Sequence, residues 1–173
     1  MFNISIHALL NWRTPLTAST HLAVGAAASI VAQRFLSSPI SNARRLFWGF
    51  VAGYASHLLL DSFPHQEYGI GGIGLGSVLF VEIVATFFLF FFSFKPRSLL
   101  ADSIIFLGMV GGAIPDFIYF VSRYFLTGSQ SEDLATIIHL FSHEAIPLGF
   151  EISIYFQLLI TLTAITFVRF KSA

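Results

Sequence analysis

The sequence contains no cysteine, and only 10% of its 173 residues are charged. The absence of cysteine excludes disulfides and thiolate metal sites, which leaves histidine, aspartate and glutamate as the side chains able to bind a metal. A soluble domain carries about 25% charged residues, so this scarcity of charge argues against a soluble protein. Nine basic and nine acidic residues cancel, and nothing in this balance indicates a partner such as nucleic acid.

Apolar residues dominate what is present. Hydrophobic residues make up 55% of the chain and the mean hydropathy is +0.79, which is typical of an integral membrane protein. We expect residues 1–173 to form a single all-α domain, a polytopic membrane helical bundle with about five transmembrane helices plus short interfacial helices. The expected spans cover residues 17–36, 46–63, 77–94, 99–126 and 147–168.

The basic residues predict how this bundle is oriented. By the positive-inside rule, loops rich in lysine and arginine face the cytoplasm. The first loop, the third loop and the end of the chain hold most of these residues: Arg34, Arg44, Arg45, Lys95, Arg97, Arg169 and Lys171. We therefore expect the protein in the inner or plasma membrane, with the N-terminus outside.

Two pairs of polar residues lie at helical spacing. His57 and Asp61 are four residues apart and would share one face of a helix. His65 follows four residues later, after a proline that we expect to end the helix. His139 and His143 repeat the spacing of four. Imidazoles and carboxylates in this arrangement suit a borderline metal such as zinc.

On the five-span arrangement these residues gather in one half of the membrane, expected to be the extracytoplasmic half. A carboxylate inside the membrane costs roughly 2.5–3.5 kcal/mol on insertion scales, so several of them beside histidines indicate a binding site. They suffice for one or two divalent ions, with zinc as the expected metal. The predicted metal ligands are His21, His57, Asp61, His65, Asp116, His139 and His143. The predicted catalytic acids or bases are Glu82, Glu144 and Glu151.

Pro115 predicts a break in the fourth span. Proline lacks a backbone N–H, and its ring points toward residue 111, which is glycine. We expect a kink or local unwinding just before Asp116, with Gly111 and Gly112 packed against a neighbouring helix.

Four short motifs resemble one family. Gly53-Tyr-Ala-Ser-His57-Leu-Leu-Leu-Asp61 resembles the Gly-x-x-Ser-His-x-x-x-Asp segment of the inner-membrane metal-dependent hydrolases of the YdjM-like, LexA-regulated group. The other three matching segments are Thr20-His21-Leu-Ala-Val-Gly25, Gly112-Ala-Ile-Pro115-Asp116 and His139-Leu-Phe-Ser-His143. The family's second acid after its Pro-Asp pair is replaced here by Ile118. The family is distantly similar to zinc-dependent phospholipases C, so the resemblance implies a metal-dependent hydrolase.

Together, these observations predict a membrane-bound hydrolase. Its expected reaction is cleavage of a phosphoester in a phospholipid or lipid-linked substrate by metal-activated water. One alternative is a transporter that binds and releases a metal ion, and another is a scaffold whose helices are stapled by polar residues without catalysis. A transporter should also carry polar residues across the other half of its spans. The first, second, third and fifth spans have almost none there, which favours the enzyme.

Overall fold

The computed structural model of the protein describes residues 18–36, 39–61, 80–81, 83–88, 90, 98–125 and 150–171. Every regular element within these ranges is a helix, so the predicted all-α class is confirmed. The four long helices are α2 (Ala18–Phe35), α3 (Asn42–Asp61), α5 (Leu99–Phe125) and α7 (Phe150–Lys171). Residues 80–81, 83–88 and 90 are also helical.

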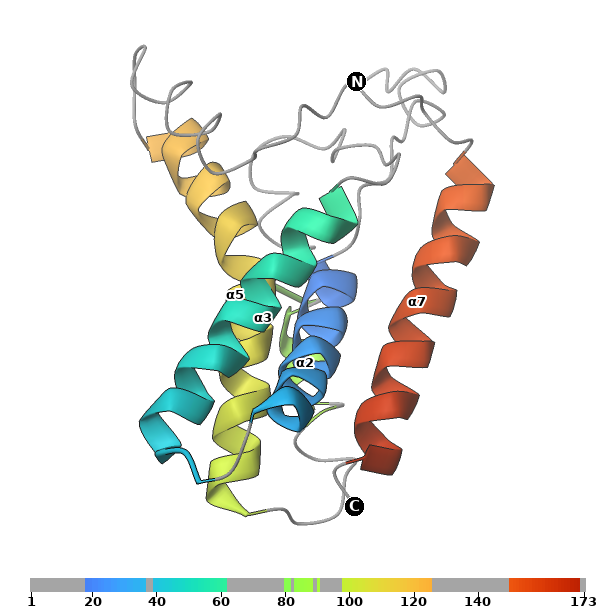
Figure 1. The fold of residues 1–173 in the computed structure, drawn as a ribbon. Helices are drawn as coiled ribbons and strands as arrows, with labels where there is room; N and C mark the ends of the chain where they lie inside the picture. Colours follow the sequence, from blue (N-terminus) through green and yellow to red (C-terminus); the bar gives the residue numbers. More distant parts are fainter. Residues whose placement is uncertain are drawn as a thin grey trace, which may run out of the picture.

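Three of the long helices form the centre of the structure. α2, α3 and α5 each pack against the other two, and α7 packs along α2 (Figure 1). α2 and α7 run in one direction, whereas α3 and α5 run in the opposite direction. The starts of α2 and α7 and the ends of α3 and α5 therefore share one end of the bundle, which is the upper end in Figure 1.

Serine side chains fix where two helices begin. The Ser41 hydroxyl accepts a hydrogen bond from the Arg44 N–H at 3.4 Å, ahead of α3. The Ser98 hydroxyl accepts one from the Ala101 N–H at 3.2 Å, ahead of α5. These are N-caps, which pair backbone donors that a first helical turn leaves open. α3 consequently begins at Asn42 rather than at residue 46, because the cap extends the helix through polar residues that hydropathy alone assigns to a loop.

Small residues let the three central helices approach closely. A Cβ placed on Gly108 would lie 2.5 Å from the Cβ of Ser29 and would also meet the carbonyl of Gly25. A Cβ on Gly53 would clash with the Gly108 backbone from the other side. Only glycine fits where two helices cross α5 at the same turn.

The predicted break at Pro115 is only partly observed. Gly111 packs against the backbone of Phe50 and Tyr54 in α3, and Gly112 packs against the backbone of His21 and Gly25 in α2, as expected. α5, however, is helical without interruption from Leu99 to Phe125, so the predicted local unwinding is not found. Pro115 is fully buried, so close packing on both sides supports the helix where the proline removes a hydrogen bond.

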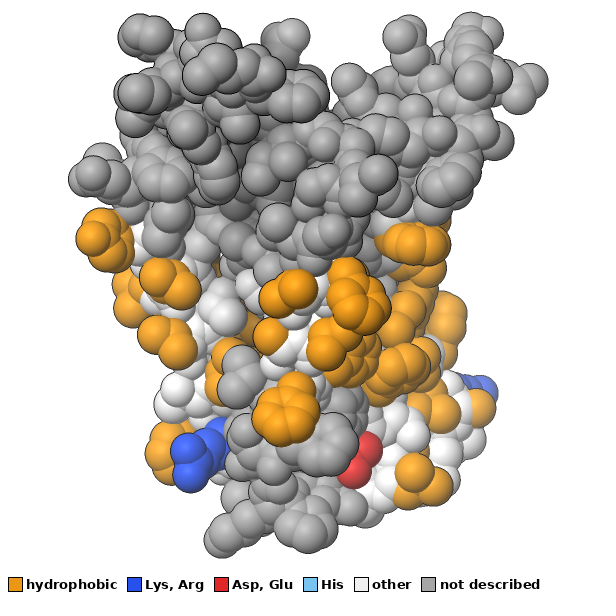
Figure 2. Space-filling view, turned by 180° about the vertical axis from the view of Figure 1, so that it is seen from behind, with side chains coloured by type: hydrophobic (Ala, Val, Ile, Leu, Met, Phe, Trp, Pro, Cys, Tyr) orange, Lys and Arg blue, Asp and Glu red, His pale blue; other side chains and the backbone are white. Residues whose placement is uncertain are grey.

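A cluster of buried apolar side chains forms the core of the described bundle. Its buried side chains include Leu22, Ala26, Ile105, Met109 and Val168. Many large apolar side chains elsewhere are exposed, and Figure 2 shows them spread over the middle of one face, with Lys and Arg toward its lower end. One described helix segment, Leu99–Ile118, is long and apolar enough to cross a membrane. The full set of five spans stays a prediction.

Candidate metal centre

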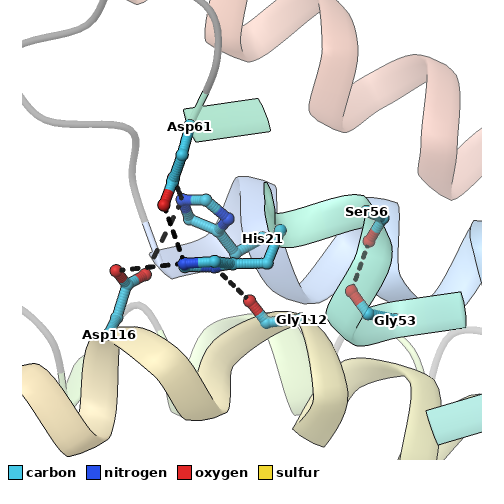
Figure 3. A network of polar contacts seen from close by, with 7 residues as sticks. His21, Gly53, Ser56, Asp61, Gly112 and Asp116 are labelled. Atoms are coloured by element: carbon cyan, nitrogen blue, oxygen red, sulfur yellow. Dashed lines mark hydrogen bonds and ion pairs between the residues drawn. The ribbon is translucent and has the colours of Figure 1, made fainter. Parts of the chain in front are cut away.

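Four predicted ligands from three helices meet at one point near the upper end of the bundle. His21 comes from the first turn of α2, His57 and Asp61 from the last two turns of α3, and Asp116 from the second half of α5. Figure 3 shows His21, Asp61 and Asp116 pointing toward one another from their three helices. Close packing of these helices brings together residues that are up to 95 positions apart in the sequence, from His21 to Asp116.

The four side chains alternate around a ring of imidazole nitrogens and carboxylate oxygens. His21 Nε2 lies 3.8 Å from Asp61 Oδ1 and 3.6 Å from Asp116 Oδ2. His57 Nε2 lies 2.9 Å from Asp61 Oδ2 and 3.8 Å from Asp116 Oδ1. Each carboxylate thus presents one oxygen to each histidine.

Three of these four separations fit ligands of a shared cation better than hydrogen bonds. A hydrogen bond between nitrogen and oxygen spans about 2.7–3.2 Å, so pairs at 3.6 and 3.8 Å do not form one. Two ligands bound to one zinc ion at roughly 2.0–2.2 Å with tetrahedral angles lie about 3.4 Å apart. One ligand atom each from His21, His57 and Asp116 lies within 4.8 Å of the others, and these three residues could hold a metal ion.

A backbone carbonyl sets the protonation of the His57 ring. His57 Nδ1 lies 2.9 Å from the Gly112 carbonyl oxygen, and because a carbonyl only accepts, Nδ1 must carry the hydrogen. In the neutral ring this leaves the Nε2 lone pair directed at the two carboxylates. Metal-binding histidines commonly donate their other N–H to a carbonyl in this way. The His21 and His57 rings lie with their centroids 4.4 Å apart.

The centre is closed on one side and open on the other. The His21, His57 and Asp61 side chains are at most 3% exposed, whereas the Asp116 side chain is 42% exposed. Two carboxylates beside two buried imidazoles place negative charge in a low-dielectric setting, where a bound cation would be strongly attracted. Asp116 marks the side from which a small molecule or ion reaches the cluster.

The remaining predicted site residues fall outside the described part of the chain. These are His65, Glu82, His139, His143 and Glu144. Glu151 lies in the first turn of α7, but its side chain is outside the described set as well. Their predicted roles as ligands or as catalytic bases stay predictions.

Two features of the centre were not predicted from the sequence. The first is the Gly112 carbonyl as the partner of His57; no sequence signal marks it, because every residue carries a backbone carbonyl. The second is the role of Ser56 beside His57. Its hydroxyl donates to the Gly53 carbonyl at 2.7 Å within α3 and so is directed away from the cluster (Figure 3).

Comparison of the chain with protein-family models, with curated proteins and with solved structures found no match. The resemblance to the inner-membrane metal-dependent hydrolases therefore stays a prediction, and any function proposed for this chain rests on the geometry of the centre.

Proposed function

We propose that the protein is a membrane-bound, metal-dependent hydrolase that cleaves a phosphoester of a phospholipid or lipid-linked substrate. The single observation that carries this proposal is the ring formed by His21, His57, Asp61 and Asp116. Two nitrogen and two carboxylate donors without a thiolate suit zinc, although the same donors also bind other divalent ions.

The number of clustered ligand residues matches that of a catalytic metal site. Catalytic zinc sites use three protein ligands and keep one position open for water, whereas structural sites are closed by four. His21, His57 and Asp116 supply the three, and the exposed side of Asp116 supplies the opening. A divalent ion bound there would activate water and polarise a phosphoryl oxygen.

Asp61 is the buried acid best placed to handle a proton. Its Oδ2 lies 2.9 Å from His57 Nε2, and its side chain is 3% exposed. With the metal held by the other three residues, this carboxylate either joins as a fourth ligand or accepts the proton of the attacking water. Its charge in both cases offsets that of a divalent cation in a site shielded from solvent.

The surface of α5 next to the centre favours a substrate that lies in a membrane. Phe117 and Ile118 follow Asp116 directly, and they are 64% and 37% exposed. On a helix these side chains point about 100° and 200° away from Asp116, so they cover the outer faces of α5 at the depth of the centre. Exposed apolar groups next to a polar site are typical of proteins that act at membranes.

The apolar core below the centre argues against ion transport. Ala26, Ile105 and Met109 are buried beyond the centre toward the lower end, where a transported ion would need polar groups to replace its water. The buried Ser29 lies at that depth, but its hydroxyl donates to the Ala26 carbonyl at 2.7 Å within α2. The ring of ligands lies at one end only, which suits an ion that stays bound during catalysis.

Metal analysis of purified protein tests the proposal. We expect about one or two zinc ions per chain and hydrolysis of a lipid phosphodiester that a chelator abolishes and zinc restores. Asp116→Asn should lose metal and activity, whereas Asp102→Asn should keep both, because Asp102 lies in the first turn of α5, far along the same helix. Wild-type protein that binds no divalent metal would contradict the proposal and favour the stapled scaffold. Metal bound without any hydrolysis of phosphoesters would contradict the enzymatic part.

A further inference from the structure

We propose that Thr161 of α7 is a positioning residue for the metal centre, because its hydroxyl pairs with Thr20 and so holds α2 in the orientation that places His21. This inference rests on the proposed metal centre and adds to it a helix that contributes no ligand among its described side chains.

The contact lies directly beside a ligand. Thr20 Oγ1 and Thr161 Oγ1 are 2.9 Å apart, and Thr20 immediately precedes His21 in the chain. Thr20 is fully buried at 0% exposure. A hydroxyl pair in such surroundings is a directional link between helices.

Further along the two helices the described contact is largely apolar, apart from Arg34 of α2, whose guanidinium lies 6.0 Å from the centroid of the Phe167 ring of α7. Ala164 and Val168 of α7 belong to the same buried cluster as Leu22 and Ala26 of α2. Apolar burial is non-directional, so it holds the helices together without selecting a single rotation or axial position. The hydroxyl pair supplies that selection at the end of α2 where His21 lies.

The glycine contacts of α2 are made with α5 and not with α7. Gly25 packs on Gly108 and Gly112 of α5, which sets how closely the two helices approach. That contact involves backbone atoms on one side of α2, whereas Thr20 faces α7. A tilt of the start of α2 away from α7 would move His21 Nε2 relative to the carboxylates that it faces at 3.6 and 3.8 Å. Metal–ligand bonds tolerate deviations of only about 0.2 Å, so the ion would bind more weakly.

Thr161→Val tests the proposal because it replaces the hydroxyl with a methyl group of similar size. The matched control is Thr163→Val in the same helix, whose hydroxyl donates to the Leu159 carbonyl at 2.7 Å and faces solvent or lipid. The probe is Co²⁺ alone, titrated into metal-free full-length protein and followed by its visible absorption. Residues that orient metal ligands typically change metal affinity 10–100-fold, and we expect a loss of at least about tenfold for Thr161→Val.

Two further variants distinguish a positioning role of Thr161 from a general loss of stability. Thr161→Ser keeps a hydroxyl and should restore affinity and the Co²⁺ spectrum, while Thr163→Val should match the wild type. Thr20→Val combined with Thr161→Val should cost no more than either change alone, since both remove the same link. Wild-type protein that binds Co²⁺ together with unchanged affinity in Thr161→Val would overturn the positioning role alone. Wild-type protein that fails to bind Co²⁺ would overturn the metal centre and this inference together.

Discussion

His57 is the residue in which the packing and the chemistry of the centre are most directly joined. Its Nδ1–H donates to the Gly112 carbonyl at 2.9 Å, and its Nε2 lies 2.9 Å from Asp61 Oδ2. A neutral ring would thus direct a lone pair at a carboxylate, which repels it. A cation at this point, either a proton shared between them or a metal ion, resolves the conflict.

Replacing His57 by asparagine separates the two roles of the ring. The asparagine amide occupies nearly the place of Nδ1 and can donate to the Gly112 carbonyl, but it has no counterpart of Nε2. We expect His57→Asn to lose metal binding, as His57→Ala does. Without metal, His57→Asn should be more stable than His57→Ala by about 0.5–1.5 kcal/mol, which is the usual value of one hydrogen bond.

Chemical denaturation of the metal-free variants measures the difference in stability between His57→Asn and His57→Ala. Metal analysis of the purified variants measures the loss of metal binding. Equal stability of the two variants would mean that the bond to Gly112 contributes nothing. Retained metal in His57→Asn would show that Nε2 is not a ligand.

The ligands themselves could be predicted from sequence, but their backbone partner could not. His57 and Asp61 share a helical face by spacing alone, and His21 and Asp116 stand out as polar residues in apolar segments. The Gly112 carbonyl has no such signal, because every residue carries a carbonyl and only the packing of α3 on α5 selects this one. Thr20 and Thr161 are likewise ordinary in sequence until α7 is placed on α2.

At the scale of helices, the glycines and the predicted ligands lie on the same face of each helix. In α5 a column with a spacing of four contains Gly108, Gly112 and Asp116. In α3 the facing column contains Gly53, His57 and Asp61. The glycines bring the helix backbones into contact, and the polar residues continue each column toward the upper end. The close crossing therefore fixes the distances in the centre.

Gly108→Ala tests this coupling between packing and metal binding. The new Cβ would lie 2.5 Å from both the Gly25 carbonyl oxygen and the Ser29 Cβ, so α2 must shift. Overpacking of this kind costs about 1–3 kcal/mol, although alanine has the better helix propensity by about 1 kcal/mol. We expect a lower thermal midpoint and weaker metal binding, measured by thermal unfolding and by Co²⁺ titration.

Ser103→Ala is the control for helix propensity, because Ser103 is a half-buried residue five positions earlier in α5. Ser103→Ala should leave the thermal midpoint and the Co²⁺ affinity near their wild-type values. Metal affinity that is unchanged in Gly108→Ala would show that the centre does not depend on how closely α2 approaches α5.

Sequence periodicity predicted the presence of the helices better than their detail. The expected span at residues 17–36 corresponds to α2, and the one at residues 99–126 corresponds to α5. α3 begins earlier than hydropathy indicates, because Ser41 caps it ahead of its polar first turn. α7 continues beyond the expected end at residue 168 and includes Arg169 and Lys171. The unwinding expected at Pro115 does not occur. The sequence could not show this, because a single sequence does not identify the helices that pack against α5.

At the scale of the whole molecule, most of the basic residues in the described helices lie at the end opposite the metal centre; the exception is Arg123, in the last turn of α5. Arg34 lies at the end of α2, Arg44 and Arg45 in the first turn of α3, and Arg169 and Lys171 at the end of α7. These helix ends share the lower end in Figure 1, opposite the end at which His21 and Asp61 lie. Exposed apolar side chains cover the zone between the two ends (Figure 2). If the protein spans a bilayer, as we propose, the positive-inside rule predicts that its basic end faces the cytoplasm.

The absence of native cysteine makes this orientation directly measurable, because one introduced thiol is the only site that a maleimide can label. Ser41 is exposed at the basic end, just before α3, and Ser19 is half-buried next to the metal centre at the start of α2. In right-side-out membrane vesicles, a membrane-impermeant maleimide should label Ser19→Cys, and Ser41→Cys should react only after permeabilisation. The physical reason is that arginines near the ends of spans are retained on the cytoplasmic side. The opposite pattern would place the metal centre on the cytoplasmic side, and labelling of both variants in sealed vesicles would contradict a structure that crosses the bilayer.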